Sequence, residues 1–254
     1  MILAIDMGNS NIVIGGIDEK HTHFMERITT DIRKTDLEYA VSIKNIFEIH
    51  GLNPRDVEGA ILSSVVPPLN PIIQTAVRKV TGMQCKLVGA GMKTGMNIRM
   101  DDPKKVGADL IVDSVAAKAE YPLPIIVIDM GTATTITVVD KHGDYIGGII
   151  HPGLRVSLDT LSSRTAQLPH IDLESPGPVI AKNTVESMRS GILYGSASMM
   201  DGIIDRMEEE LGCKASIVAT GGLAPFVAPL CRHKLIVDDD LLLKGLLILY
   251  RKNS

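Results

Sequence analysis

The sequence has 254 residues, a length that predicts one large or two small domains. With 45% hydrophobic and 22% charged residues, its composition is that of a globular protein and excludes a disordered, collagen-like or coiled-coil chain. A formal net charge of −4 and only 3% aromatic residues, none of them tryptophan, argue against binding to nucleic acids through phosphates or base stacking.

The cysteines, the N-terminal residues and the apolar stretches favour a reducing compartment and no membrane association. The three cysteines, Cys85, Cys213 and Cys231, are widely spaced and form no Cys-x-x-Cys motif. The N-terminal residues carry no basic leader, and the longest apolar stretch, 241–250, is interrupted by Lys244 and is far shorter than the roughly 20 residues of a membrane span. We therefore expect a cytoplasmic protein.

The first half of the chain alternates predicted strands and helices. Residues 1–5 have the length and β-branched character of a buried strand, which ends at Asp6 in a glycine turn and is followed by a second strand over 12–14. The further elements expected here are a helix over 36–50, a strand over 60–66, a helix over 71–80, a strand over 85–88 and a helix from Asp102 to Ala119.

The second half repeats the opening pattern. A strand over 125–128 ends at Asp129 in a glycine turn, and a second strand over 136–139 follows. A long helix is expected over 183–211, with Asn183 as N-cap, then a strand over 216–219 and a last helix over 241–251. The matched turns predict a duplicated α/β protein with mixed sheets flanked by helices, divided into domains 1–121 and 122–254.

The two glycine turns carry the most informative chemistry. They read Asp6-Met-Gly-Asn-Ser-Asn11 and Asp129-Met-Gly-Thr-Ala-Thr-Thr135. Glycine lets the backbone approach a ligand closely, amide and hydroxyl side chains add donors for phosphate oxygens, and the aspartate can hold a bridging cation. One copy alone would favour an ordinary hairpin turn, but two copies at matched strand ends, each rich in hydroxyl or amide donors, favour a pair of phosphate-binding turns.

Other phosphate motifs are absent or incomplete. The sequence has no Gly-x-x-x-x-Gly-Lys-Ser/Thr motif, and the segment 89–95 lacks the third glycine and the following helix of a dinucleotide fingerprint. Thr220-Gly221-Gly222 follows a predicted strand, where it could either lie against an adenosine or form a tight turn.

A set of ordered motifs resembles the type III pantothenate kinases, members of the superfamily of actin, Hsp70 chaperones and sugar kinases. The motifs are the two glycine turns, Val106-Gly-Ala-Asp109, Gly147-Gly-Ile-Ile-His-Pro-Gly153, Lys182-Asn-Thr-Val-Glu186 and Thr220-Gly-Gly222. The resemblance spans residues 1 to about 250. It implies two ribonuclease-H-like domains of the actin-like ATPase fold, with ATP between them, and a homodimer.

The resemblance also implies roles for individual residues. Asp109 would be the general base for the acceptor hydroxyl, and Asp129 would hold a monovalent cation, potassium or ammonium. The ATP contacts implied are Asp6, Gly8, Asn9, Ser10, Asn11, Gly131 and Thr132. The substrate contacts implied are Met100, Gly107, Ala108, Asp109, Leu110 and Thr184.

Two of these positions depart from the family pattern. Many members have Tyr where Met100 stands and Arg where Leu110 stands. An arginine offers a planar set of donors to a polar or anionic substrate, and leucine cannot replace them. Loss of such a charge-assisted hydrogen bond costs about 1.5 to 3 kcal/mol, or about 10- to 150-fold in affinity, unless another group substitutes.

The expected activity is ATP- and Mg²⁺-dependent phosphorylation of pantothenate to 4'-phosphopantothenate, the first step of coenzyme A biosynthesis. Two alternatives stay open. Met100 and Leu110 make the substrate pocket more apolar, so the acceptor of the same kinase could be another small hydroxylated molecule. The chain could instead be a non-catalytic nucleotide-binding regulator, although the presence of Asp109 weighs against this.

Overall fold

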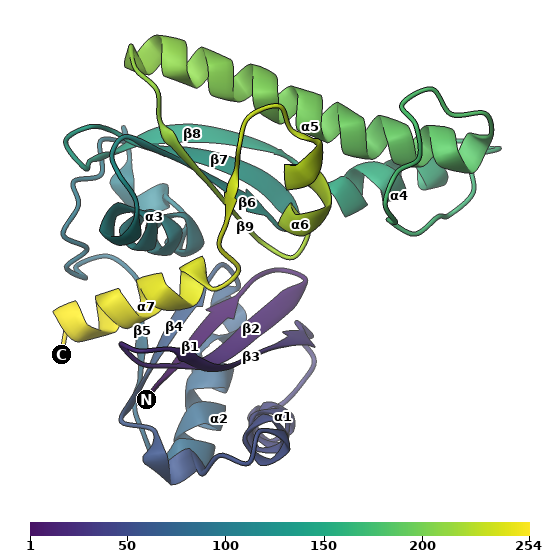
Figure 1. Cartoon of the computed structure of the whole chain (residues 1–254). Helices are drawn as coiled ribbons and strands as arrows, with labels where there is room; N and C mark the ends of the chain where they lie inside the picture. The colour runs from purple at the N-terminus through teal and green to yellow at the C-terminus, as the bar shows by residue number, and fades with distance from the viewer. The chain divides into compact units, whose positions relative to one another are not determined.

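A computed structural model describes residues 1–254, which divide into two compact units. The first unit contains residues 1–119 and 240–254, and the second contains residues 120–239. Each unit holds one five-stranded sheet, in the order β3-β2-β1-β4-β5 and β10-β9-β6-β7-β8 respectively (Figure 1). The predicted α/β class with mixed sheets is confirmed.

The two sheets repeat one topology. In the first sheet β1 pairs antiparallel with β2 and parallel with β4, and in the second β6 pairs antiparallel with β7 and parallel with β9. The first sheet consists of β1 (Ile2–Met7), β2 (Asn11–Ile17), β3 (Thr22–Thr29), β4 (Gly59–Ser64) and β5 (Cys85–Leu87). The second consists of β6 (Ile125–Met130), β7 (Ala133–Val139), β8 (Tyr145–Pro152), β9 (Ser216–Thr220) and β10 (Ile236–Val237).

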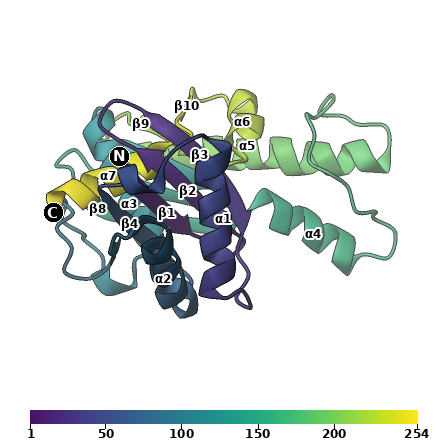
Figure 2. The same cartoon turned by 90° about the horizontal axis from the view of Figure 1, so that it is seen from below.

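In the first unit, α1 (Asp36–Ile49) and α2 (Asn70–Thr81) cover one face of the sheet (Figure 2). Leu3, Ile5 and Met7 alternate along β1 and point into the core that these helices close. Both helices lie close to their predicted ranges. A Thr35 capping box begins α1, and Gly82 in the left-handed conformation ends α2.

The opposite face of this sheet packs against α7 (Leu241–Lys252), and small residues make the close approach possible. A side chain at Gly15 would overlap Leu243, and one at Gly59 would overlap Tyr250. Residues 240–254 thus group with the first unit, whereas the predicted boundary places them in the second domain. They belong to the first unit because this sheet, rather than the second, buries the apolar side of α7.

In the second unit the main helix is α5 (Thr184–Leu211), which lies along the sheet in Figure 1. Leu193, Ala197 and Met200 of α5 pack against the side chains of β6 and β7. The predicted cap is confirmed, since the Asn183 side chain accepts a hydrogen bond of 2.9 Å from the Glu186 amide. The shorter helices of this unit are α4 (Leu154–Arg164) and α6 (Ala224–Val227).

The predicted helix from Asp102 to Ala119 is interrupted. A 3₁₀ turn, η3 (Pro103–Lys105), ends at Val106, which is extended, and α3 (Ala108–Glu120) begins afterwards. The break places Asp109 in the first turn of α3 instead of the middle of a helix. The other 3₁₀ turns are η1 (Pro54–Asp56), η2 (Pro67–Leu69) and η4 (Ala228–Leu230). No helix is both long enough and apolar enough to cross a bilayer.

Candidate functional site

The first glycine turn is short and leaves polar side chains in solvent. Asp6 is half-buried near the end of β1, and Asn9, Ser10 and Asn11 are exposed. The Gly8 amide donates to the Asn11 carbonyl over 3.0 Å and closes the turn. Exposed amide and hydroxyl groups beside a tight backbone turn are suited to bind phosphate oxygens.

Thr30 braces this turn from the residue after β3. Its hydroxyl donates to the Gly8 carbonyl over 2.7 Å, and its amide donates to the Ser10 carbonyl over 3.0 Å. Both contacts orient carbonyls of the turn towards Thr30. The sequence pattern gave no signal for this role of Thr30, because β2 and β3 separate it from the turn.

The second turn has the same construction. Asp129 is half-buried near the end of β6, the Gly131 amide donates to the Ala133 carbonyl over 3.0 Å, and Thr132 is exposed. Gly153, at the end of β8, donates its amide to the Thr132 carbonyl over 3.1 Å. A β-carbon at Gly153 would lie 2.4 Å from that carbonyl oxygen, so only glycine allows this packing.

Gly221 lies directly against Asp129. It follows β9, has a φ of +89°, and a β-carbon there would lie 2.6 Å from Asp129 Oδ1 and 2.7 Å from the Met130 carbonyl oxygen. The turn at Thr220-Gly221-Gly222 is confirmed by the hydrogen bond of 3.0 Å from the Ala224 amide to the Gly221 carbonyl, and the adenosine contact stays a prediction. The close approach leaves carboxylate and carbonyl oxygens beside bare backbone, a donor set that suits hard cations.

Asp109 occupies a half-buried position in the first turn of α3. Its Oδ1 accepts a hydrogen bond of 2.9 Å from the Leu110 amide, which fixes the carboxyl group. Burial raises the pKa of Asp109 above its ordinary value. A β-carbon at Gly107 would lie 2.4 Å from Asp109 Oδ1, so a larger residue there would displace this carboxyl oxygen.

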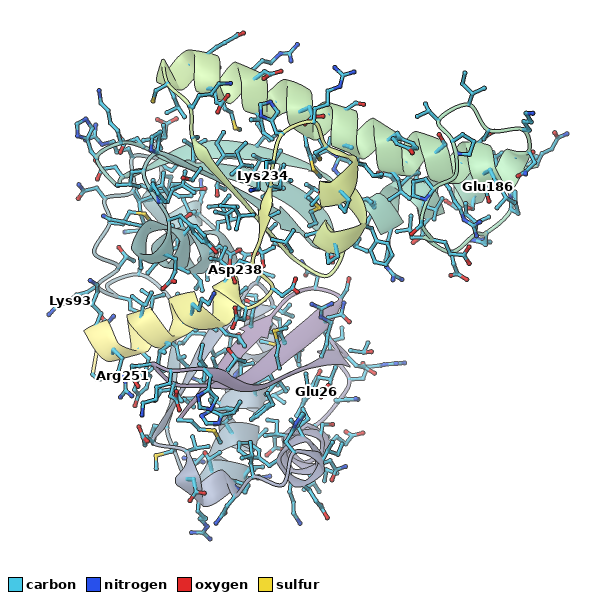
Figure 3. All side chains as sticks on the ribbon, viewed as in Figure 1. Glu26, Lys93, Glu186, Lys234, Asp238 and Arg251 are labelled. Atoms are coloured by element: carbon cyan, nitrogen blue, oxygen red, sulfur yellow. The ribbon has the colours of Figure 1, made fainter.

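The other predicted substrate contacts are less confined. Met100 is 39% exposed in the irregular segment that precedes η3, whereas Gly107, Ala108 and Leu110 are half-buried around Asp109. Thr184 is exposed at the first position of α5, in the other unit, two residues before Glu186, which Figure 3 labels near the start of this helix. The structure thus gathers the Gly107–Leu110 group in one turn, and Thr184 belongs to a separate element.

Substitution of Gly221 with Ala should lower stability. The positive φ disfavours a β-carbon by about 1 to 2 kcal/mol, and the overlap with Asp129 adds to this cost. Thermal unfolding measures the effect. Gly51→Ala is the matched control, since Gly51 also has a positive φ but no neighbouring atom within 4 Å of the added carbon. Equal effects of both substitutions would contradict a specific role for Gly221.

Comparisons with known proteins agree over the length of the chain. The family model for type III pantothenate kinase matches residues 2–206. A type III pantothenate kinase of Brevibacillus brevis is 43% identical over 256 residues, covering 100% of both chains. A type III pantothenate kinase of Syntrophobacter fumaroxidans is 44% identical over 255 residues, covering 100% of this chain and 99% of its own.

A solved structure supports the fold assignment. Component A of (R)-2-hydroxyglutaryl-CoA dehydratase from Acidaminococcus fermentans superposes with a TM-score of 0.59 at 14% identity, covering 98% of this chain and 96% of its own. The duplicated mixed sheets are those of the actin-like ATPase fold. Because both the family model and relatives of this identity span most or all of the sequence, the chain belongs to the type III pantothenate kinase family.

Proposed function

We propose that this chain transfers the γ-phosphoryl group of ATP to the primary hydroxyl of pantothenate, giving 4'-phosphopantothenate in the first step of coenzyme A biosynthesis in the cytoplasm. The observation that carries the proposal is the half-buried Asp109 carboxyl, held by the Leu110 amide beside Gly107. Family membership supplies the reaction class.

Asp109 acts as the general base. The Leu110 amide engages Oδ1, so Oδ2 is the oxygen that would accept the hydroxyl proton as the new oxygen–phosphorus bond forms. A pKa raised by burial makes Asp109 a stronger proton acceptor than an exposed aspartate.

The two glycine turns bind the phosphates. In the first turn the donors are the side chains of Asn9, Ser10 and Asn11, and in the second the donor is the side chain of Thr132, while Gly8 and Gly131 let the backbone approach the phosphates closely. Asp6 would hold Mg²⁺, and Asp129 beside Gly221 would hold potassium or ammonium. When bound, these cations neutralise negative charge on the phosphoryl group, and the protein fixes donors where that charge develops.

A single assay tests this function. ATP consumption, followed with and without pantothenate in sodium, potassium and ammonium salts, should depend on pantothenate and rise in potassium or ammonium relative to sodium. A pantothenate-dependent rate without a cation effect would remove the role of Asp129. ATP consumption that ignores pantothenate would contradict the acceptor assignment.

A second acceptor is favoured by one observation. Met100 and Leu110 stand at substrate positions and offer no charged donors to a carboxylate. A panel of small hydroxy acids and sugars, tested with ATP labelled in the γ-phosphate, separates the two possibilities. Transfer to pantothenate with the highest kcat/KM supports the proposal, and preference for an uncharged acceptor supports the alternative. Tight nucleotide binding without transfer to any acceptor would indicate a regulator.

We also propose that the enzyme is a homodimer formed through the second unit. The feature that favours this unit is an exposed apolar side chain on a sheet edge, Ile150 (75%) in the edge strand β8. Light scattering should give a mass about twice the 27.4 kDa of one chain. Ile150→Asp should yield monomers, whereas Ile49→Asp, at an exposed isoleucine of the first unit, should not. A wild-type monomer would contradict the proposal.

A further inference from the structure

The hairpin between β2 and β3 gathers three potential metal ligands. One ligand atom each of Asp18, His21 and His23 lies within 4.8 Å of the others. His23 Nε2 is 2.6 Å from Asp18 Oδ2, and His21 Nδ1 is 3.8 Å from Asp18 Oδ1. The two imidazole rings are 4.1 Å apart between centroids and tilted by 54°. All three side chains therefore converge on one volume.

The backbone holds the carboxylate in place. Asp18 Oδ1 accepts hydrogen bonds from the Lys20 amide over 2.8 Å and from the His21 amide over 3.2 Å. These bonds fix the position and orientation of the carboxylate. A carboxylate oriented by outer hydrogen bonds is the arrangement that metal-binding carboxylates adopt.

The corresponding hairpin of the second unit shows which part of this arrangement is structural. Between β7 and β8, Asp140 Oδ1 likewise accepts the amides of His142 over 2.8 Å and Asp144 over 3.0 Å. In this second hairpin, β8 begins with Tyr145, and no pair of histidines faces Asp140. The aspartate shapes the turn in both units, whereas the converging histidines occur only in the first.

A second cluster of potential ligands contains Asp205, Glu208 and His233. Its Glu208 carboxylate is already engaged by other groups. Glu208 Oε2 is 2.6 Å from the Lys214 ammonium, and Glu208 Oε1 accepts the Ala215 amide over 3.0 Å. A cation there would compete with a bound lysine. On the β2–β3 hairpin the nearby cation is Arg251 of α7, which Figure 3 labels. It is paired at 2.7 Å with Glu19, which is not one of the three potential ligands.

We propose that Asp18, His21 and His23 form a surface site for a divalent transition metal of the Zn²⁺ class. Two imidazoles and one carboxylate are ligands that Zn²⁺ accepts at about 2.0 to 2.2 Å, which places ligand atoms roughly 3.4 Å apart on a tetrahedral ion. The 2.6 and 3.8 Å separations lie on either side of that value. Water completes the coordination, since the His21 side chain is 60% exposed.

Binding replaces a hydrogen bond with bonds to the metal. The contact between His23 Nε2 and Asp18 Oδ2 is broken as Nε2 coordinates the ion, and the neutral ring then carries its proton on Nδ1. The ion links the end of β2 to the start of β3. Because β3 is the edge strand of its sheet, the expected consequence is a more stable edge hairpin.

The test is calorimetric titration of Zn²⁺ into the metal-free full chain without nucleotide, with visible absorption of bound Co²⁺ as a second readout. We expect one Zn²⁺ site in the wild type. Loss of an outer-shell partner lowers metal affinity by about 10- to 100-fold, and His21→Ala, which removes a ligand, should lower it by at least as much. His21 is largely exposed, so this variant should fold normally, which circular dichroism verifies. His142→Ala, in the corresponding turn, is the matched control and should bind as the wild type.

The outcomes separate the possible sites. Loss in His21→Ala and His23→Ala, with binding intact in His142→Ala and His233→Ala, supports the hairpin site. Unchanged binding in folded His21→Ala overturns it, as does loss only in His233→Ala, which would assign the ion to the second cluster. Absence of Zn²⁺ binding by the wild type also overturns the proposal.

Discussion

Asp109→Asn should abolish phosphoryl transfer while leaving nucleotide binding and the fold intact. Removal of a general base costs about 100- to 10,000-fold in rate. The amide keeps the size of the carboxyl group, and its oxygen can still accept the hydrogen bond from Leu110. Transfer of labelled phosphate from ATP to pantothenate measures the rate, and nucleotide titration measures binding. Asp101→Asn, at an exposed aspartate nearby, is the control.

The pKa of Asp109 gives this variant a second signature. Burial raises that pKa, so in the folded state the ionised form is disfavoured relative to the unfolded chain. Stability is then highest below the unfolded pKa and falls as pH rises through the folded pKa. At neutral pH the neutral asparagine should leave the melting temperature unchanged or higher. Turnover comparable to the wild type, or a strong loss of stability, would contradict the role of Asp109.

The same shift sets the acid limit of catalysis. The base must be ionised to accept a proton. As the pH is lowered, kcat/KM of the wild type should therefore begin to decline at a higher pH than it would with an exposed aspartate of ordinary pKa.

Gly245→Val should strongly destabilise the first unit. A β-carbon at Gly245 in α7 would lie 2.1 Å from the carbonyl oxygen of Val112 in α3, a backbone atom that cannot rotate away. Overpacking of a tight interface costs about 1 to 3 kcal/mol and occasionally more, and we expect the upper end here. Urea unfolding measures the loss. Lys244→Val, one residue away on the less buried side of α7, is the matched control.

This substitution also tests where α7 belongs. If α7 stabilises the first unit, the backbone amides of β1 and β4 should exchange their hydrogens faster in Gly245→Val than in the wild type. Faster exchange confined to β6 and β9 of the second unit would contradict the assignment.

Local signals in the sequence were sufficient for most elements. The capped helix α1, the glycine-terminated α2 and the asparagine-capped α5 all lie close to their predicted ranges, because capping residues and helical periodicity act within one element. The repeated glycine turn also predicted the duplicated topology, since each copy follows the central strand of its sheet.

Features that depend on distant packing were not readable in this way. The apolar side of α7 indicates burial but not which sheet receives it, and the informative residues are the distant Gly15 and Gly59. The edge strands β3 and β8 were missed because they are only partly buried and weakly apolar. The break before Asp109 was missed because Pro103 begins a 3₁₀ turn as well as it begins a helix.

In the proposed site, the motifs suggest chemical roles but not the contacts that support the residues. The proposed roles of Asp109 and of the polar side chains of both turns come from motifs, whereas the bracing hydrogen bonds from Thr30 join residues whose types carry no functional signal. The contact between Gly221 and Asp129 likewise depends on the parallel pairing of β6 and β9.

The most direct test of the proposed mechanism is a crystal structure of the full chain with a non-hydrolysable ATP analogue, Mg²⁺, potassium and pantothenate. The proposal requires one triphosphate in contact with both the Gly8–Asn11 turn and the Gly131–Thr132 turn, with the pantothenate hydroxyl at Asp109 Oδ2. A triphosphate held by only one turn, or a hydroxyl remote from Asp109, would contradict it.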